Sequence, residues 1–151
     1  MIKNKISLSK FLISDITENY LSWIRNKSLI KFTEIKNTKI ENVIKYVRDN
    51  NNNKKKNLLK ILFNKIHIGN LGIQKIGKGK AAIGIFIGNK KFHNKGIGTR
   101  VIKMAINLLK KDKNIKTIIA TINKLNYRSQ SIFKKNNFVK KKNSDFYYYN
   151  V

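Results

Sequence analysis

Hydrophobic and polar residues alternate at the start of the chain, as they do in a strand that buries one face. The alternation extends over residues 2–13 and marks Ile6, Leu8 and Leu12 as core contacts. We therefore expect the chain to begin with a strand.

Two segments with helical spacing follow this strand. Apolar residues recur every three or four positions over residues 16–26, and Asp15 stands before the first turn as the expected N-cap. The same spacing begins again at Thr38 and ends in the polar stretch 50–56, which is expected to be a loop. Four apolar residues form one face of this second helix: Ile40, Val43, Ile44 and Val47.

Short apolar runs and amphipathic runs make up the rest of the chain, and they predict strands and helices respectively. The expected strands are 58–64, 66–76, 81–88, 116–122, 138–142 and 145–151, and the expected helices are 98–111 and 126–136. Residues 1–151 are then a single α/β (α+β) domain, with a mixed central sheet of about seven strands and about four helices.

Residue composition limits the kinds of site and the location to expect. The chain has 151 residues, 41% of them hydrophobic, which suits one domain with a core of its own. It contains no cysteine, and His67 and His93 lie far apart without a carboxylate nearby, so we expect no metal site. No apolar stretch approaches the ~20 residues of a membrane span, and the N-terminus lacks a signal-peptide core. A cytoplasmic location without a membrane partner is therefore expected.

The formal net charge of +27 makes nucleic-acid binding a function class to consider. Most of this charge comes from lysines in every segment, whereas proteins that recognise specific bases rely on arginine. The arginines are Arg25, Arg48, Arg100 and Arg128. Lysine, asparagine and isoleucine share A/T-rich codons, so a biased genome explains the charge more simply. We expect anionic ligands to be attracted but no specific nucleic-acid partner, and a basic nucleic-acid-binding or structural protein stays as an alternative.

A glycine-containing loop is the first candidate for chemistry. Residues 93–99 (HNKGIGT) join a predicted strand to a predicted helix, whose N-terminal N–H groups and partial positive charge suit phosphate. Gly96 and Gly98 allow a close approach of the backbone, and Lys95 and Arg100 lie on either side in the sequence. The loop alone is equally compatible with a phosphate cradle and with a flexible connection.

This loop resembles the acyl-CoA pyrophosphate loop of the GNAT superfamily of N-acetyltransferases, written Q/R-x-x-G-x-G/A. Gly96 and Gly98 match its small positions, whereas His93 stands at the Q/R position. Residues 126–138 (NYRSQSIFKKNNF) resemble a second motif of the superfamily, N-x-x-S/A-x-x-x-Y/F-x-K-x-G-F. Asn137 replaces its glycine, and asparagine is the next-best residue for a left-handed position after a helix. The expected order of elements resembles that of the superfamily over essentially the whole chain.

The resemblance implies that acetyl-CoA is the acetyl donor and lies in a V-shaped split between strands 81–88 and 116–122. Main-chain groups around Phe86 and Ile87 would bind the pantetheine arm. Asn126 has two open roles, as a contact to the donor and as the N-cap of its helix. The N–H groups that would hold the pyrophosphate belong to Asn94, Lys95, Gly96, Ile97, Gly98 and Thr99.

Two side chains are candidates for catalysis. Many members of the superfamily protonate the CoA thiolate with a tyrosine, but Phe133 stands at that position here. Ser129 is the best alternative, because a hydroxyl can relay a proton, although it would equally fill the first turn of a helix. Glu34 is the candidate general base or ligand of the substrate ammonium, and a chain of waters is the alternative.

The N-terminal half bears on the acetyl acceptor. Residues 13–34 and the HIGN stretch 67–70 resemble the branch of ribosomal-protein N-terminal acetyltransferases and amino-sugar-nucleotide N-acetyltransferases. The closer fit to the sugar-directed group rests on Trp23, Asn26, Ile30, Lys31 and Phe32. The resemblance implies direct transfer in a ternary complex to a small-molecule amine, an amino sugar on a nucleotide, by a monomer or homodimer. The N-terminal amine of a protein is the alternative acceptor.

Overall fold

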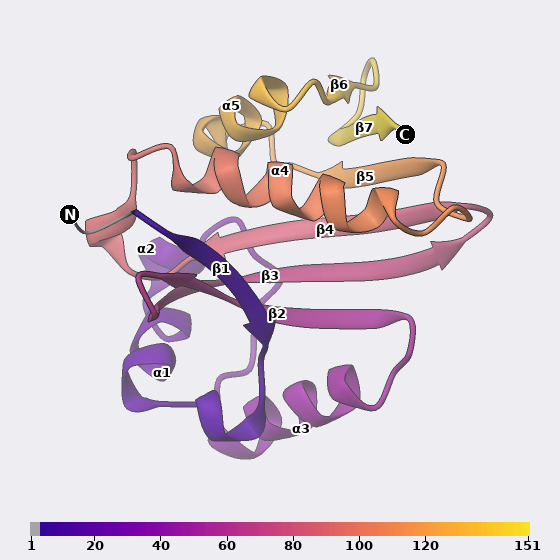
Figure 1. Ribbon diagram of the computed structural model, residues 1–151. Coiled ribbons are helices and arrows are strands. Elements are labelled where there is room, and N and C mark those ends of the chain that lie inside the picture. Colours follow the sequence, from indigo (N-terminus) through magenta and orange to yellow (C-terminus); the bar gives the residue numbers. More distant parts are fainter. Residues whose placement is uncertain (1–3) are drawn as a thin grey trace.

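One sheet runs through the protein in the strand order β1-β2-β3-β4-β5-β7-β6. The computed structural model describes residues 4–151 (Figure 1). The strands are β1 (Ile6–Lys10), β2 (Lys56–Phe63), β3 (Ile66–Gly77), β4 (Lys80–Ile87), β5 (Thr117–Thr121), β6 (Val139–Lys140) and β7 (Phe146–Asn150). The helices are α1 (Glu18–Ile24), α2 (Lys27–Ile30), α3 (Ile40–Asn51), α4 (Ile97–Lys110) and α5 (Tyr127–Lys135), with 3₁₀ turns η1 (Ile13–Asp15) and η2 (Lys90–Phe92).

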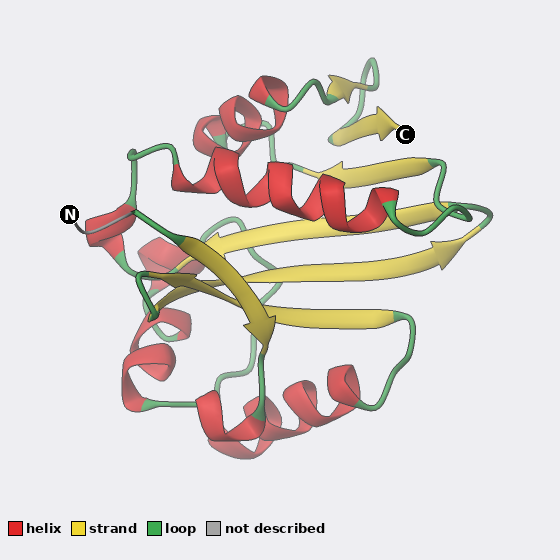
Figure 2. Ribbon diagram, in the orientation of Figure 1, coloured by secondary structure: helices red, strands yellow, loops and turns green. Residues whose placement is uncertain are grey.

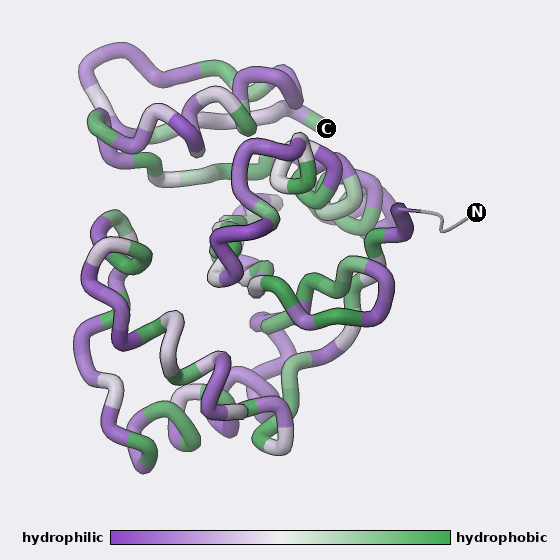
Figure 3. Tube along the Cα trace, turned by 90° about the vertical axis from the view of Figure 1, so that its left-hand side faces the viewer, coloured by the Kyte–Doolittle hydropathy of each residue, from purple (hydrophilic) through white to green (hydrophobic). Residues whose placement is uncertain are grey.

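Helices cover both faces of this sheet (Figure 2). Helices α4 and α5 lie on one face, and α1, α2 and α3 lie on the other, as the view along the strands also shows (Figure 3). Each face has its own core. The larger core joins the sheet to α4 and α5, and the smaller one joins it to α1 and α3 and includes Phe11, Trp23 and Val47. The apolar periodicity of the sequence predicts this arrangement because burial selects one face of every element.

The predicted mixed sheet with seven strands is confirmed, and so is the order of the elements. Residues 4–151 contain five helices rather than about four, because the four-residue α2 follows α1. Asn26 explains this extra helix, since its side-chain oxygen accepts hydrogen bonds from the N–H groups of Ser28 and Leu29. No helix within residues 4–151 has the length and hydrophobicity that crossing a bilayer requires.

The first strand and the first helix depart from the prediction. The strand ends at Lys10, and Leu12 is 45% exposed rather than a core contact. Asp15 does not cap α1, because its carboxylate accepts from the N–H of Leu12 and pairs with Lys60. Thr17 is the N-cap of α1 instead, and its hydroxyl accepts from the N–H of Tyr20 at 3.1 Å.

The second predicted helix also begins later than expected. Helix α3 starts at Ile40, and its N-cap Lys39 makes no side-chain capping bond, so Thr38 lies before the helix. Val43 and Val47 are buried as predicted, whereas Ile40 is 39% exposed. Burial of Val43 and Val47 in the smaller core, which also contains Leu58 of β2, therefore defines this helix more than its cap does.

Candidate active site

Strands β4 and β5 separate after a short parallel contact, and this creates the predicted V-shaped split. Their pairing consists of Lys80 with Thr117, Ala81 with Ile118 and Ala82 with Ile119. Beyond this point β4 continues to Ile87 without a partner on its β5 side, and the two strands diverge (Figure 1). The split therefore opens along the second half of β4.

The register of β4 decides which main-chain groups face the split. The N–H of Gly88 donates to the carbonyl of Ile68 at 2.9 Å. Because hydrogen-bonding direction alternates along an antiparallel pair, Phe86 directs its main-chain groups to β3, opposite Asn70. The main-chain groups of Ile85 and Ile87 face the split.

The main chain of Phe86 is therefore not available to bind the pantetheine arm, contrary to the expectation from the sequence. Its side chain packs against the smaller core, and its main chain belongs to the β3–β4 pairing. Ile87 keeps its predicted place at the split, and Ile85 joins it. Sequence reasoning missed Ile85 because the period of a strand shows which residues alternate but not which of the two sets pairs with a given neighbour.

The loop before α4 presents a run of free N–H groups. The first hydrogen bond of helix α4 runs from the N–H of Arg100 to the carbonyl of Gly96, so the preceding N–H groups have no acceptor within the helix. Within the part of the chain that the structure describes, the N–H groups of residues 94–99 have no hydrogen-bond partner. They include the start of α4, where the helix dipole is positive. The loop therefore has the geometry of an anion cradle.

The two glycines of this loop have different roles. Gly96 has a φ of 73°, in the left-handed region, and a Cβ there would meet no atom within 4 Å. Its role is conformational, and the space beside it is open to a ligand. Gly98 is buried, and a Cβ there would lie 2.6 Å from Cδ1 of Ile132 on α5. Gly98 therefore allows α4 to pack closely against α5.

The cationic side chains near the loop are not the expected pair of Lys95 and Arg100. Lys95 lies with its ammonium 5.9 Å from the centre of the Phe92 ring. Arg100 instead donates to the carbonyl of Asn4, outside the loop. Arg128 takes its place, since its Nη1 donates to Nδ1 of His93 at 2.7 Å. The sequence offers no signal for this contact, because Arg128 stands at an unspecified position of the second motif and lies 35 residues after His93.

Helix α5 begins at the predicted cap. The side-chain oxygen of Asn126 accepts from the N–H of Ser129 at 3.2 Å, so its capping role is confirmed. Ser129 is half-buried in the first turn, and no hydrogen bond of its hydroxyl is found within residues 4–151. Phe133 is buried in the larger core, edge-on to Phe138. The residue after the helix cap, Asn137, has a φ of 65°, as predicted for a left-handed position.

Glu34 makes no hydrogen bond to these groups within the described part of the chain. It is exposed in the segment between α2 and α3, and no hydrogen bond or ion pair links it to another residue in the described range. Burial raises the pKa of Tyr46 on α3, a hydrogen bond with Asn50 opposes this, and the negative charge of Glu34 adds to the rise. No hydrogen bond joins Glu34 to Ser129 within the described residues.

An aromatic cluster that sequence reasoning did not single out as a unit lies beneath the end of β4. The ring of His67 stacks on Tyr20 and lies edge-on to Trp23, with centroids 6.1 and 5.1 Å away. Its Nε2 faces the oxygens of Gly69 and Asn70 and therefore carries the proton. Burial lowers the pKa of His67, and burial raises that of Tyr20 to about 12.

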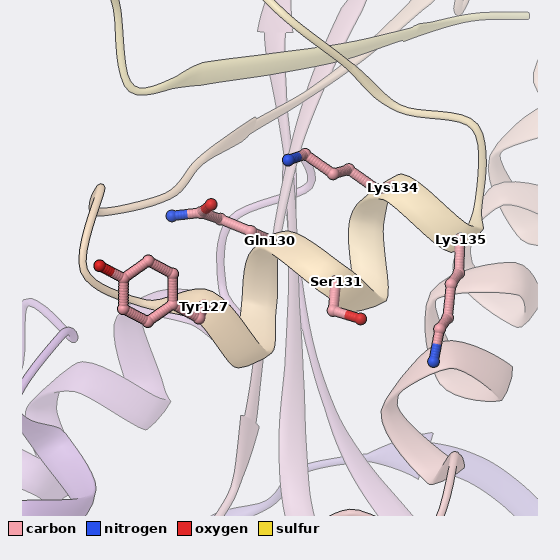
Figure 4. A pocket seen from close by; sticks show the side chains of 5 residues that line it. All are labelled: Tyr127, Gln130, Ser131, Lys134 and Lys135. Carbon is pink, nitrogen blue, oxygen red and sulfur yellow. The ribbon is translucent and has the colours of Figure 1, made fainter.

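A shallow hollow of about 490 Å³ lies along the outer side of α5 (Figure 4). It is lined by Tyr127, Gln130, Ser131, Lys134 and Lys135, which follow one another at helical spacing. None of the predicted site residues lines it. No group of three or more potential metal ligands is found within residues 4–151.

Comparison with known proteins identifies the family. Residues 5–139 match the family model of the acetyltransferase (GNAT) domain. No curated protein matches the sequence. Among solved structures, a domain from Methanocaldococcus jannaschii is 23% identical, with a TM-score of 0.82 over 99% of this chain and 100% of that one.

Two further structures have functional names. An aminoglycoside acetyltransferase in complex with coenzyme A is 14% identical, with a TM-score of 0.83 over 97% of this chain and 95% of that one. The spermidine N-acetyltransferase of Vibrio cholerae, in complex with CoA and spermine, is 13% identical, with a TM-score of 0.83 over 96% of this chain and 95% of that one. At these identities the likeness shows a shared fold.

Proposed function

The chain belongs to the GNAT family of acetyltransferases and uses acetyl-CoA as its donor, and from this premise we propose that its acceptor is the primary amine of an amino sugar on a nucleotide. The observation that supports the donor side most directly is the run of free N–H groups at residues 94–99. It lies at the start of α4 and close in sequence to the open half of β4.

The donor is held mainly by the backbone in this proposal. The N–H groups of residues 94–99 bind the pyrophosphate, and the open conformation at Gly96 leaves room for it. The main-chain groups of Ile85 and the N–H of Ile87, which face the split, bind the pantetheine arm and polarise the thioester carbonyl. Asn126 contributes its side-chain amide at the start of α5.

The transfer itself is a direct attack. A neutral amine nitrogen bonds to the thioester carbon, the carbon–sulfur bond breaks, and CoA leaves as a thiolate. The hydroxyl of Ser129 donates a proton to that sulfur and regains one from solvent. Glu34 takes the proton that the amine loses, directly or through water. The roles of Ser129 as general acid and of Glu34 as general base are both part of this proposal.

The acceptor class is supported by the N-terminal half of the chain. Residues 13–34 resemble the sugar-directed branch, and in the structure Trp23 lies at the end of β4 while Phe32 and Glu34 are in the exposed segment after α2. An aromatic ring with a carboxylate suits a sugar that has a protonated amine. A structural neighbour of this chain acetylates aminoglycosides, which are also amino sugars.

A screen of acceptors with acetyl-CoA tests the proposal. Nucleotide amino sugars are compared with simple polyamines and with peptides that bear the N-terminal sequences of ribosomal proteins, and free thiol is measured. Acetylation of a nucleotide amino sugar with the highest kcat/KM is the expected result. A preference for the peptides would replace the proposed acceptor with the N-terminal amine.

The donor site has its own test. Gly96→Glu places a carboxylate in the anion cradle and should abolish saturable binding of acetyl-CoA. Gly77→Glu is the matched control, because Gly77 also has a positive φ of 88° and no atom within 4 Å of its Cβ position, but lies at the β3–β4 turn. Equal binding by both variants would show that the loop does not hold the donor.

A further inference from the structure

His93 stands where the loop motif has glutamine or arginine, and in the structure its ring connects two parts of the fold. Its Nε2 lies 2.7 Å from the carbonyl oxygen of Ile87, and its Nδ1 lies 2.7 Å from Nη1 of Arg128. A carbonyl accepts and a guanidinium donates, so Nε2 carries the proton and Nδ1 presents its lone pair. The ring is therefore neutral, in one tautomer, and joins the end of β4 to the first turn of α5.

Arg128 is available for an anionic ligand. It is exposed, and its bond to His93 is the one hydrogen bond found for it within the described residues, so the remaining guanidinium N–H groups are free. By contrast, Arg25 donates to the carbonyl of Thr38, and Arg100 donates to that of Asn4. No ion pair with a carboxylate neutralises Arg128 in residues 4–151.

We propose that His93 is a positioning residue that holds the guanidinium of Arg128 beside the anion cradle, where Arg128 binds the phosphates of the acyl-CoA. This inference rests on the proposed donor site at residues 94–99. It assigns the cation of the cradle to Arg128, which follows His93 by 35 residues, and gives His93 an indirect role.

The geometry explains why a histidine suits this place. Its two nitrogens face opposite partners, so one rigid ring fixes the distance between β4 and the guanidinium. The bond also occupies the carbonyl of Ile87, which leaves the N–H of that residue for the donor. An arginine already held by one charge-assisted bond loses little freedom when it binds phosphate, and a planar guanidinium matches phosphate oxygens.

Binding of CoA to four proteins tests this assignment by calorimetry: the wild type, Arg128→Gln, His93→Ala and the double variant. Arg128→Gln should weaken binding about 10- to 100-fold, as expected for a lost hydrogen bond to a charged group. His93→Ala should weaken it less. The double variant should bind as Arg128→Gln does, because His93 acts through Arg128. Arg48→Gln removes the same charge from α3, on the other face of the sheet, and should bind CoA as the wild type does.

Turnover gives a second readout. Both single variants should raise KM for acetyl-CoA and leave kcat within about twofold, since a phosphate contact is the same in the ground state and the transition state. Additive losses in the double variant would overturn the positioning role, and unchanged CoA affinity in Arg128→Gln would overturn the site. Failure of the wild type to bind CoA would instead reject the donor site itself.

Discussion

The indole ring of Trp23 lies directly against Gly88, at the position that a Cβ of residue 88 would occupy. Trp23 is buried in α1, and Gly88 follows the last residue of β4. The contact therefore seats the first helix on the end of the strand that borders the split. In this way the helix on the proposed acceptor side contacts the end of the strand on the proposed donor side.

Replacement of Gly88 by alanine should be destabilising for this reason. The added methyl group has no room unless α1 or the indole moves, and overpacking of this kind costs about 1–3 kcal/mol. Gly84→Ala is the matched control on the same strand, because its Cβ position has no atom within 4 Å. Urea unfolding should show a lower midpoint for Gly88→Ala and an unchanged or higher one for Gly84→Ala. Equal midpoints would mean that Trp23 is not held firmly against β4.

Ser129→Ala should slow turnover far more than it weakens binding of acetyl-CoA. Loss of a general acid lowers kcat by about a hundredfold or more, whereas the backbone cradle remains intact. Ser131→Ala, on the outer side of the same helix, removes a hydroxyl from the hollow lined by Tyr127 and Lys134 and should leave kcat unchanged. Steady-state kinetics with saturating donor measure both. A wild-type kcat in Ser129→Ala would assign the proton to water.

Asn126 allows its two possible duties to be separated. Asn126→Ala removes the cap of α5 and should cost about 0.5–2 kcal/mol of stability. Asn126→Asp keeps an oxygen for the N–H of Ser129, so stability should stay near that of the wild type. It also replaces the amide donor with a negative charge, so CoA binding should fall. If CoA affinity in Asn126→Asp equals that of the wild type, Asn126 acts as a cap alone.

The sequence predicts the order of the elements because burial leaves a periodic trace in every strand and helix. It predicts their ends less well, and Asp15 and Thr17 show why. Both residue types favour an N-cap, and the choice between them depends on Lys60, a residue 45 positions away that pairs with Asp15. A local pattern contains no information about such a partner.

In the candidate site, too, local features could be predicted from the sequence and contacts between distant residues could not. The left-handed conformation of Gly96 was predictable, because a glycine before a helix has a local conformational reason to be there; that the loop holds phosphate was expected from the family resemblance and stays a proposal. The contact of His93 with Arg128 was not predictable, since it depends on the packing of α5 beside the loop. The exchange of Phe86 for Ile85 at the split has a similar origin, because strand pairing decides it.

His67 should make stability depend on pH in mildly acidic solution. Burial lowers its pKa, and the nearby ammonium of Lys60 adds to this, although hydrogen bonds with Asn70 and Gly69 and the charge of Asp15 act in the opposite direction. In the unfolded chain, His67 therefore takes up a proton near the ordinary pKa of histidine, 6.5. In the folded protein, the same side chain stays neutral to a lower pH. Above the ordinary pKa the residue is neutral in both states and has no effect. As the pH falls below it, stability is lost until the folded pKa is reached, by at most about 1.4 kcal/mol per pH unit.

Urea unfolding of the wild type and of His67→Gln between pH 7.5 and 5 isolates this contribution. The variant is expected to be less stable at neutral pH, since it loses the aromatic contacts with Tyr20 and Trp23. Its stability should fall less steeply with decreasing pH than that of the wild type, because glutamine does not titrate. The lowered pKa of Asp15 acts only further into acid, below its ordinary value of 3.8, so the two effects occupy separate ranges. Parallel curves for the two proteins would show that His67 titrates in the fold as it does in the unfolded chain.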